Sequence, residues 1–510
     1  MKFKDFPHFI FVEKPHGMSS HAATLNKWGL VEFLQHELHQ KLFLFQRLDR
    51  DTSGCIVLAK SSEAAAELTE IWKSKQAEKT YWCLTDRSVS FSEKTVVSQI
   101  TKKGNTFVSD SSAKDDLAET QFRVLAKNGN ITLLEARPFT GKPHQIRLHA
   151  QDLGISLLGD KEHGGSAFHR LALHAKKLRF TFRDQDFDFD SKAPDWMENL
   201  ELLSDETTCT WISALEKRLR LQSLEKNECL RLFHEEDPDF RMDLFGSQFW
   251  IYDYTLPEEK KKKLLEFCKS RVFENGFVRQ MLNRGQNPGS SDLSVEGSPK
   301  SEWTAIENSI SYVFKSEQGL SPGLFLDQRY NRQWVRENSK DKEVLNLFSY
   351  TGGFSVAAAL GQANKVTTVD LSKGFLEWSK QNFSLNGLDS EKHEFWASDS
   401  FMFLQGCLKR QRIFDLAICD PPSFSRMKDR VFKIEKDFPE LLDLCVRVLK
   451  PGGKLIFCTN FEKWSEKDLV QNAKKLFSKN KIQIETLRST AFDYEGFDRE
   501  SLMKTLLITR

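Results

Sequence analysis

Hydrophobic and polar positions divide the chain into two stretches with different periodicity. From residue 1 to about 200, short apolar runs alternate with turns, and long helical patterns are few. The predicted strands are 42–45, 55–59, 81–84 and 133–136, and the predicted amphipathic helix is 63–75. This mixture is typical of an α+β domain built on a mixed, mainly antiparallel sheet.

Beyond residue 343 the pattern changes to apolar strand, helix, apolar strand. The predicted strands are 344–348, 366–370, 414–419 and 454–459, which indicates a Rossmann-like, doubly wound parallel sheet. A small α/β domain is predicted before it, with strands at 249–254 and 309–314 and a Gly-, Ser- and Pro-rich loop at 284–301. We therefore expect a multidomain chain, divided at 1–200, 201–228 (a helical connector), 229–330 and 331–510.

Composition restricts the class of protein. The 510 residues exceed what one core can organise, and a formal net charge of +2 means that any nucleic-acid surface must come from local patches. Basic clusters at 260–263 and 279–284 are candidates, although such runs are more often solvated helix faces. Nine cysteines without a Cys-x-x-Cys pair argue against a zinc site or a disulfide framework. With no apolar run of about 20 residues, we expect a cytoplasmic protein without a membrane span.

A run of polar residues, Arg47-Leu48-Asp49-Arg50-Asp51-Thr52-Ser53-Gly54, separates two predicted strands. A glycine-terminated turn between strands can hold the Asp49 carboxylate outward on a rigid element, as catalysis requires. Taken alone, an aspartate in a turn can equally be a turn cap.

Three further segments resolve this ambiguity. They are Lys14-Pro15-x-Gly17 with His21, Lys79-x-Tyr81, and the block 140–149 followed by Leu158-Gly159-Asp160. With the Asp49 run, they resemble RluA-type pseudouridine synthases over residues 8–185. The resemblance implies that Asp49 acts on a flipped uridine, at the ribose carbon or by removing the neighbouring proton. It also implies that Tyr81 stacks on the base, with a hydroxyl that can accept the C5 proton, and that Arg147 pairs with Asp49. Gln46 in place of a usual His, and Lys142-Pro143 in place of Arg-Thr, bear on RNA specificity.

A second motif follows the strand at 344–348. Residues 346–354 contain the Gly352-Gly353 pair, which lets backbone approach a nucleoside closely, and Asp370 ends the next strand 18 positions after Gly352. That spacing suits a carboxylate that binds ribose hydroxyls, and Asp399 can bind an adenine amine. Both carboxylates can instead be helix caps. A dehydrogenase is the rival, but no Gly-x-Gly-x-x-Gly occurs here and Asp420-Pro421-Pro422 follows the strand at 414–419.

These residues, with the element Gly323-Leu324-Phe325-Leu326-Asp327-Gln328-Arg329, resemble the large-subunit rRNA methyltransferases of the RlmI/RlmK group over most of 229–510. The resemblance implies a Rossmann-like class I methyltransferase with S-adenosylmethionine (SAM) as cofactor and no metal. It implies a cofactor pocket lined by the following residues: Gln328, Arg329, Phe348, Tyr350, Gly352, Asp370 and Asp399.

The methylated atom depends on one position. Methylation at cytosine C5 needs a cysteine thiolate that adds to the base, whereas here Thr459 stands at that position and Cys458 one place early. A shift of one residue in a strand turns the thiol to the opposite face. An adenine-amine methylase would have an aromatic residue where Ser423 stands. Guanine N7 is therefore favoured, cytosine C5 stays open, and Asp420 would position the base or shape the methyl pocket.

The sequence thus predicts a bifunctional enzyme that acts on 23S rRNA, forming pseudouridine and methylating a base. The alternatives are a methyltransferase whose first half is a silent RNA-binding module, and an enzyme directed at tRNA. A methyltransferase that does not act on nucleic acid is a more distant possibility. In each of the first three cases the partner is RNA.

Overall fold

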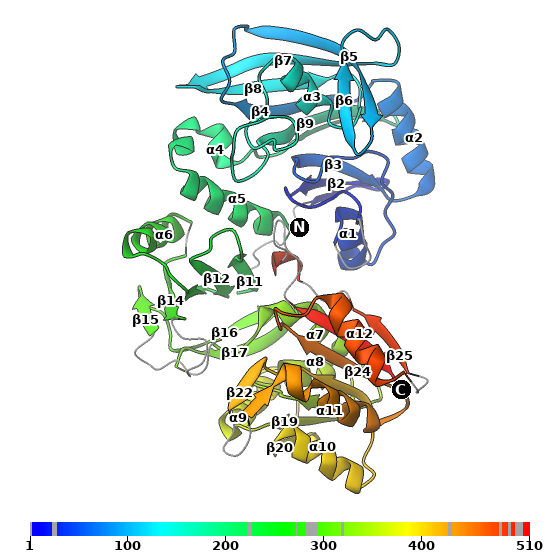
Figure 1. Cartoon of the computed structure of the whole chain (residues 1–510), viewed down its shortest axis with the longest axis vertical. Helices are drawn as coiled ribbons and strands as arrows, with labels where there is room; N and C mark the ends of the chain where they lie inside the picture. Colours follow the sequence, from blue (N-terminus) through cyan, green and yellow to red (C-terminus); the bar gives the residue numbers. More distant parts are fainter. Residues whose placement is uncertain are drawn as a thin grey trace. The chain divides into compact units, whose positions relative to one another are not determined.

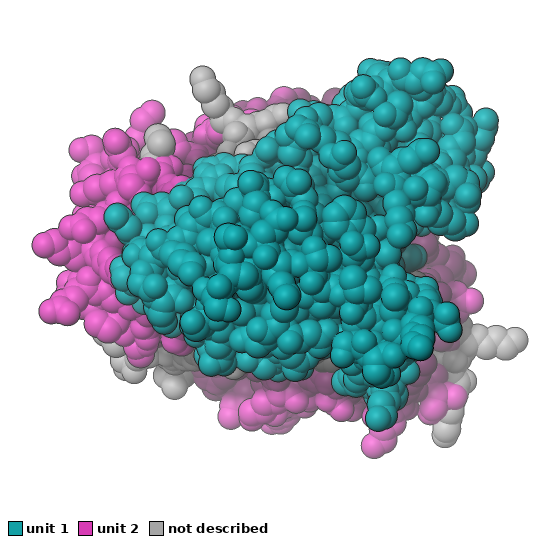
Figure 2. Space-filling model, turned by 90° about the horizontal axis from the view of Figure 1, so that it is seen from above, with its two compact units in different colours: residues 1–223 teal, residues 224–510 magenta. Residues whose placement is uncertain are grey.

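The computed structural model describes residues 3–22, 28–221, 227–271, 273–281, 293–317, 321–426, 431–478, 482–487, 491–494 and 503–510 (Figure 1). The chain divides into two compact units, residues 1–223 and 224–510, which are coloured separately in Figure 2. No helix among these described residues is long and apolar enough to cross a membrane.

The first unit is built on a ten-stranded sheet of order β1-β2-β3-β9-β4-β8-β7-β5-β6, with β10 paired to β9. Its strands are β1 (Phe3–Asp5), β2 (Phe9–Lys14), β3 (Ser53–Ala59), β4 (Glu78–Thr85), β5 (Glu93–Lys103), β6 (Thr106–Asp110), β7 (Leu117–Asn128), β8 (Ile131–Pro138), β9 (Leu173–Phe182) and β10 (Gln185–Asp190). Neighbouring strands are antiparallel apart from the parallel pair β3 and β9, so the prediction of a mixed, mainly antiparallel sheet is confirmed.

One predicted strand of this unit is wrong. Residues 42–45 make only an isolated bridge, between Phe43 and Ala59. The Leu42 N–H donates to the Gln35 side chain at 3.0 Å, and the Gln46 side chain accepts from Trp72 at 3.0 Å. The segment thus has one two-way backbone pairing, between Phe43 and Ala59, and a side-chain bond at Leu42, instead of the continuous ladder of a strand.

Helices of the first unit are α1 (Leu30–Leu38), α2 (Ser62–Lys73), α3 (Gln145–Asp152), α4 (Asp195–Glu198) and α5 (Glu206–Leu221), with a 3-10 turn η1 (Leu200–Ser204). Trp211 of α5 is buried, and Arg220 donates to Glu13 at 3.2 Å and to the Lys192 carbonyl at 2.6 Å. The helix predicted as a connector is therefore packed into the first unit, and residues 222–226 lie outside the described residues.

The second unit begins with the small sheet β11 (Cys229–Phe233), β12 (Phe240–Phe245), β13 (Gln248–Asp253), β14 (Asn275–Gln280) and β15 (Leu293–Glu296), the helix α6 (Glu258–Ser270), and the hairpin β16 (Glu302–Glu307) and β17 (Ile310–Lys315). The predicted loop 284–301 is wrong at β15, which pairs antiparallel with β14. The alternation Leu-Ser-Val-Glu supports that edge strand. The loop's residues 284–292 lie outside the described residues.

The rest of the second unit is a seven-stranded sheet of order β20-β19-β18-β21-β24-β26-β25. Its strands are β18 (Glu343–Leu347), β19 (Lys365–Asp370), β20 (Glu394–Ala397), β21 (Phe414–Cys419), β24 (Leu449–Thr459), β25 (Gln483–Thr486) and β26 (Lys504–Thr509). The remaining elements are η3 (Leu326–Gln328), α7 (Arg329–Glu337), α8 (Gly353–Leu360), α9 (Lys373–Leu385), η4 (Ser390–Lys392), α10 (Ser400–Lys409), the hairpin β22 (Phe424–Arg426) and β23 (Val431–Lys433), α11 (Ile434–Arg447), α12 (Glu466–Leu476) and η5 (Phe492–Tyr494). Strands β18 to β21 and β24 are parallel, whereas β26 is antiparallel to both neighbours.

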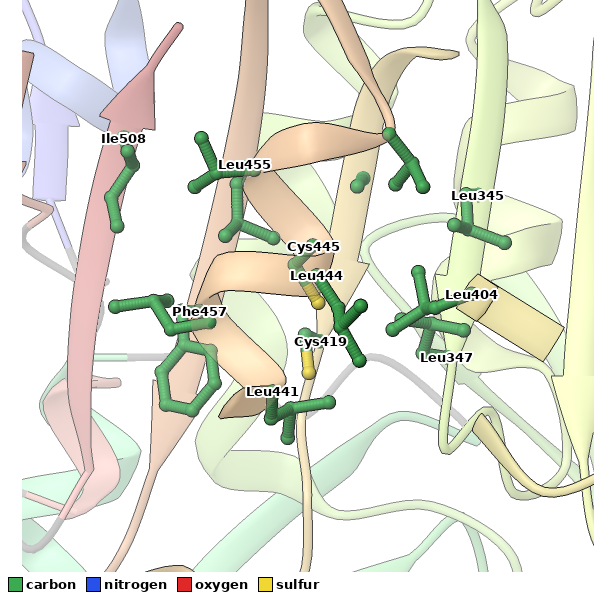
Figure 3. Packing of buried hydrophobic residues seen from close by; sticks show 14 of the residues in the cluster. Leu345, Leu347, Leu404, Cys419, Leu441, Leu444, Cys445, Leu455, Phe457 and Ile508 are labelled. Atoms are coloured by element: carbon green, nitrogen blue, oxygen red, sulfur yellow. The ribbon is translucent and has the colours of Figure 1, made fainter. Parts of the chain in front are cut away.

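Two apolar clusters cover opposite faces of this sheet. Leu347, Cys419 and Phe457 pack with α10 and α11 in one cluster (Figure 3). Ile418 and Cys458 belong to the other cluster, which also holds residues of α7, α8 and α9 and of the small domain. Because successive strand residues point to opposite faces, the parallel strands are held from both sides. Their carboxyl ends meet where the strand order reverses, between β18 and β21, which is where open α/β sheets bind ligands.

Candidate active sites

The turn that carries Asp49 is anchored through its backbone. Both the N–H and the carbonyl of Leu48 bond to the Ser20 hydroxyl, at 3.1 and 2.9 Å. The Arg50 carbonyl accepts from Lys14 Nζ at 2.9 Å. The Asp49 side chain is 29% exposed, so a fixed backbone presents a carboxylate that solvent and substrate can reach.

Lys14 is fully buried beneath this turn. Its ammonium also donates to the carbonyls of Pro15 and Met18, at 3.0 and 2.6 Å, so it joins the first motif to the Asp49 turn. Burial lowers the pKa of Lys14 to about 7, while the charges of Asp51 and Asp49 act in the opposite direction. The motif around Lys14 was visible in the sequence, but the contact with the Asp49 turn was not.

Arg147 on α3 lies beside Asp49, but its main partner is another carboxylate. Its Nε and Nη2 bond to the two oxygens of the buried Asp160 at 2.7 and 2.6 Å, and Nη2 also bonds to Glu162 at 2.7 Å. The distance from Nη1 to Asp49 Oδ2 is 3.5 Å. Burial alone would lower the pKa of Arg147, but the bonds and charge of Asp160 raise it, so the guanidinium stays charged. Sequence reasoning missed Asp160 and Glu162, although Gly159-Asp160 was part of a motif.

Tyr81 lies on β4, half-buried. Burial raises the pKa of its phenol, and the charge of Asp49 raises it further, which places the two groups in one electrostatic environment. The hydroxyl therefore stays neutral, and any proton that it accepts must reach a neutral oxygen.

In the second unit, the glycine turn after β18 has an unusual backbone. Phe348, Tyr350 and Gly352 have φ values of 53°, 50° and 76°. A Cβ on Gly352 would lie 1.9 Å from Ser379 Oγ, so only glycine fits there. This conformation turns the chain from β18 into α8 and directs the Tyr350 N–H toward β19.

Asp370, at the end of β19, receives that N–H. Its Oδ2 accepts from Tyr350 N at 2.8 Å and its Oδ1 from Ser372 N at 2.9 Å. Burial raises its pKa, and these backbone bonds oppose the rise. Ser372 is the N-cap of α9, whereas Asp399 is itself the N-cap of α10, through Oδ1 and Met402 N at 3.0 Å. The capping role considered for both residues therefore applies to Asp399, whose Oδ2 takes no part in the cap.

Gln328 and Arg329 are neighbours in the sequence but have different hydrogen-bond partners. Gln328 is buried, accepts from Asn331 at 2.6 Å, and forms a hydrogen bond that lowers the pKa of Asp420. Arg329 donates to Asp493 at 3.2 Å and to the Cys229 carbonyl at 2.8 Å. Its guanidinium thus bonds to other parts of the protein, and its contact with the cofactor stays a prediction.

Asp420 follows β21 and shares its surroundings with Asp327 of η3. Burial raises the pKa of Asp420 to about 7, and the charge of Asp327 adds to this effect. Burial likewise raises the pKa of Asp327 to about 6, and its Oδ1 is buried without a hydrogen-bond partner among the described residues. Sequence reasoning named Asp420 but not Asp327, which lies in the element 323–329 that it had singled out.

The thiol of Cys458 lies near Asp420 and Asp327, and it forms a hydrogen bond with Gln328. Cys458 is buried in the cluster on the α7–α9 side, where the Asn331 amide contacts its Sγ at 3.4 Å, and burial, with the charges of the two carboxylates, raises the pKa of its thiol well above the usual value. Thr459 is buried, and its hydroxyl accepts from Phe461 N at 3.2 Å. All nine cysteines are buried.

The basic clusters predicted as RNA contacts give little support to that role. Lys260 on α6 is paired with Asp237 and Asp239, at 2.8 and 2.7 Å. Arg279 is buried and donates to the Ser316 carbonyl at 3.3 Å. Residues 282–284 lie outside the described residues.

The residues at the carboxyl ends of β18, β19 and β20 fit SAM. A bound nucleoside needs acceptors for its ribose hydroxyls and adenine amine, and apolar surface for its ring. Asp370 and Asp399 supply carboxylate oxygens. Leu371 and Met402, which follow them, are 55% and 71% exposed and supply apolar surface.

Comparisons with known proteins agree with this division. A model of SAM-dependent methyltransferases matches residues 270–504, and one of RNA pseudouridylate synthases matches residues 8–152. The ribosomal RNA large subunit methyltransferase K of Neisseria meningitidis serogroup B is 35% identical over 269 residues, which cover 50% of this chain and 76% of that protein. This chain belongs to the methyltransferase K family. It is a fusion of such a methyltransferase with a pseudouridine synthase domain, and its cofactor is SAM, as predicted.

Other relatives of the methyltransferase K family are longer. The ribosomal RNA large subunit methyltransferase K/L of Pseudoalteromonas atlantica is 33% identical over 252 residues, which are 47% of this chain and 35% of that protein. The chain therefore spans about a third of this K/L relative. A structure described as a SAM-dependent methyltransferase from Streptococcus mutans has a TM-score of 0.51 at 22% identity, covering 70% of this chain and 89% of that one, and it supports the fold.

Proposed function

We propose that this chain is a bifunctional enzyme that modifies 23S rRNA in the cytoplasm, converting a uridine to pseudouridine and methylating a base, with guanine N7 as the favoured target. The names of the methyltransferase K and K/L relatives support rRNA as the substrate. The observation that carries the isomerase half is the Asp49 carboxylate, which is partly exposed on an anchored turn with the charged Arg147 at 3.5 Å.

In the isomerase half, Asp49 acts on a uridine extruded from its helix, at the ribose carbon or on the neighbouring proton. Arg147 lies beside Asp49, and Asp160 holds its guanidinium in position. Tyr81 offers its ring to the base. The uracil then rotates and rejoins through carbon. Extrusion costs a few kcal/mol, so a loop or bulge is the expected substrate.

In the methyltransferase half, the buried thiols support guanine N7 over cytosine C5. Cytosine C5 must be activated by a thiolate, whereas guanine N7 is already nucleophilic and needs only orientation. Bound SAM supplies an electrophilic methyl group. When ionised, Asp420 can accept hydrogen bonds from the N–H groups of guanine and so orient the base, and Gln328 orients Asp420.

The direct test is to incubate the full-length protein with unmodified 23S rRNA and tritiated SAM, then to identify the nucleosides by mass spectrometry. We expect the wild type to form both pseudouridine and 7-methylguanosine. Cys458→Ala should transfer the methyl group at the same rate as the wild type. If the wild type forms labelled 5-methylcytosine and Cys458→Ala does not, the methylated base is cytosine and the assignment to guanine is wrong. Methyl transfer without pseudouridine would make the first half an RNA-binding module, and modification of tRNA alone would refute the rRNA assignment.

We expect Asp327→Asn to move the acid limb of the methyl-transfer pH profile to lower pH. In the wild type the rate should fall as the pH drops through the pKa of Asp420, about 7, because protonated Asp420 accepts hydrogen bonds less well. Removal of the Asp327 charge favours ionisation of Asp420, so its pKa falls and activity persists at lower pH. Single-turnover rates across this pH range measure the shift.

The control for this shift is Asp420→Asn, which should lower the rate about 10- to 100-fold, the effect of one or two charged hydrogen bonds, and remove the acid limb. A wild-type profile without an acid limb near pH 7, or coincident profiles for Asp327→Asn and the wild type, would contradict the role given to Asp420.

A further inference from the structure

We propose that His144, Glu162 and His163 form a binding site for a borderline divalent cation such as Zn²⁺, beside the pseudouridine synthase site. One ligand atom from each residue lies within 4.8 Å of the others. His144 Nδ1 is 3.0 Å from His163 Nε2 and 3.6 Å from Glu162 Oε2. In a tetrahedral zinc site with bonds of about 2.0–2.1 Å, ligand atoms lie about 3.3 Å apart, so these atoms are already near ligand spacing.

The backbone that carries these ligands is fixed. His144 is the N-cap of α3, with φ of 56°. The His163 N–H donates to Asp160 Oδ1 at 3.2 Å, and its carbonyl accepts from Ser156 Oγ at 2.7 Å. The same loop packs tightly at Gly165, where a Cβ would lie 1.9 Å from the Leu157 carbonyl oxygen. A rigid backbone of this kind lowers the cost of bringing three ligands together.

The donor set has the chemistry of a zinc site with an open position. Two imidazoles and one carboxylate are typical protein ligands of Zn²⁺, and a fourth position would be left for water or a ligand oxygen. Glu162 is 62% exposed, so a cation can approach from solvent.

Without a cation, the three side chains have other partners, and these connect the site to Asp49. The two imidazoles bond to each other, and Glu162 Oε2 accepts from Arg147 Nη2 at 2.7 Å. For both imidazole nitrogens to bind a cation, the imidazole that donates the bond between them would carry its proton on its other ring nitrogen, and Glu162 would leave Arg147 for the cation. Because Arg147 Nη1 is 3.5 Å from Asp49, occupancy would alter the surroundings of Asp49. We therefore expect the bound cation to inhibit pseudouridine formation, an effect that rests on the proposed function, whereas binding does not.

The test of binding is a titration of metal-free, full-length protein with Co²⁺, followed by its visible absorption, with Zn²⁺ as competitor. We expect one equivalent with tetrahedral bands, displaced by Zn²⁺. His163→Gln and the exposed Glu162→Gln should each weaken binding at least ~10-fold, while the matched His8→Gln should not. Absence of stoichiometric binding, or unchanged binding in both ligand variants, would overturn the site.

Activity separates the binding claim from the proposed function. Stoichiometric Zn²⁺ should lower pseudouridine formation by the wild type but not by Glu162→Gln, and methyl transfer by either protein should not change. Binding without inhibition would uphold the site and overturn its connection to Arg147. A protein that binds Co²⁺ as expected but never forms pseudouridine would refute the isomerase function and leave the site standing.

Discussion

Asp49→Asn is expected to lower pseudouridine formation at least ~10³-fold and to leave methyl transfer unchanged. An amide can neither attack the ribose carbon nor accept a proton, so the variant loses activity by either route. Asparagine has almost the same size, and the turn is held through Leu48 and Arg50 instead of through the carboxylate. The two products, measured in one reaction by mass spectrometry of nucleosides, report both activities.

The matched control is Asp51→Asn, an exposed carboxylate two residues away in the same turn. Its pseudouridine formation should stay within a few-fold of the wild type, since Asp51 has no role in either route. Equal activity of Asp49→Asn and the wild type would exclude Asp49 as the reacting group. Equal losses in both variants would mean that the charge of the turn matters instead of the position of one carboxylate.

Asp370→Asn is expected to weaken SAM binding at least ~100-fold and to lower the free energy of unfolding by about 1–3 kcal/mol. Each carboxylate oxygen accepts one backbone N–H, from Tyr350 and from Ser372. An asparagine has one oxygen and one NH₂, so one of these N–H groups would face another donor. The glycine turn would lose its anchor together with the acceptor for the ribose. Calorimetry with SAM, and thermal unfolding without it, measure the two effects.

Asp399→Asn serves as the comparison, because asparagine is as good an N-cap as aspartate and can keep the bond to Met402 N. We expect little change in its thermal unfolding and a smaller loss of SAM affinity. If Asp370→Asn binds SAM as the wild type does, the ribose role of Asp370 is wrong. A loss of stability without a loss of affinity would make Asp370 a residue that only holds the turn.

The sequence by itself determined the features that depend on local periodicity and on residue type. Alternating apolar strands and helices after residue 343 predicted the parallel sheet, because strands buried on both faces require continuous apolar runs. The Gly352-Gly353 pair could be singled out because it follows a predicted strand and opens a helix, whereas the contact with Ser379 that excludes a side chain at Gly352 came from the structure. Strand alternation places Cys458 on the face opposite to that of Phe457, but the nearness of its thiol to Asp420 was not visible in the sequence.

Only the tertiary structure decided which side chains meet across distant segments. Arg147 bonds to Asp160 and Glu162 and also lies beside Asp49. Asp327 lies close enough to Asp420 for its charge to raise the pKa of Asp420, and Arg329 bonds to Asp493. The cation site escaped sequence reasoning because His144 lies 18 residues before Glu162, without the short spacing of a metal motif. Such contacts depend on how helices and loops pack, and no local pattern encodes the packing partner of a charged side chain. The strand predicted at 42–45 failed for the same reason, because the segment pairs with β3 only at Phe43 and Leu42 bonds to a side chain of α1.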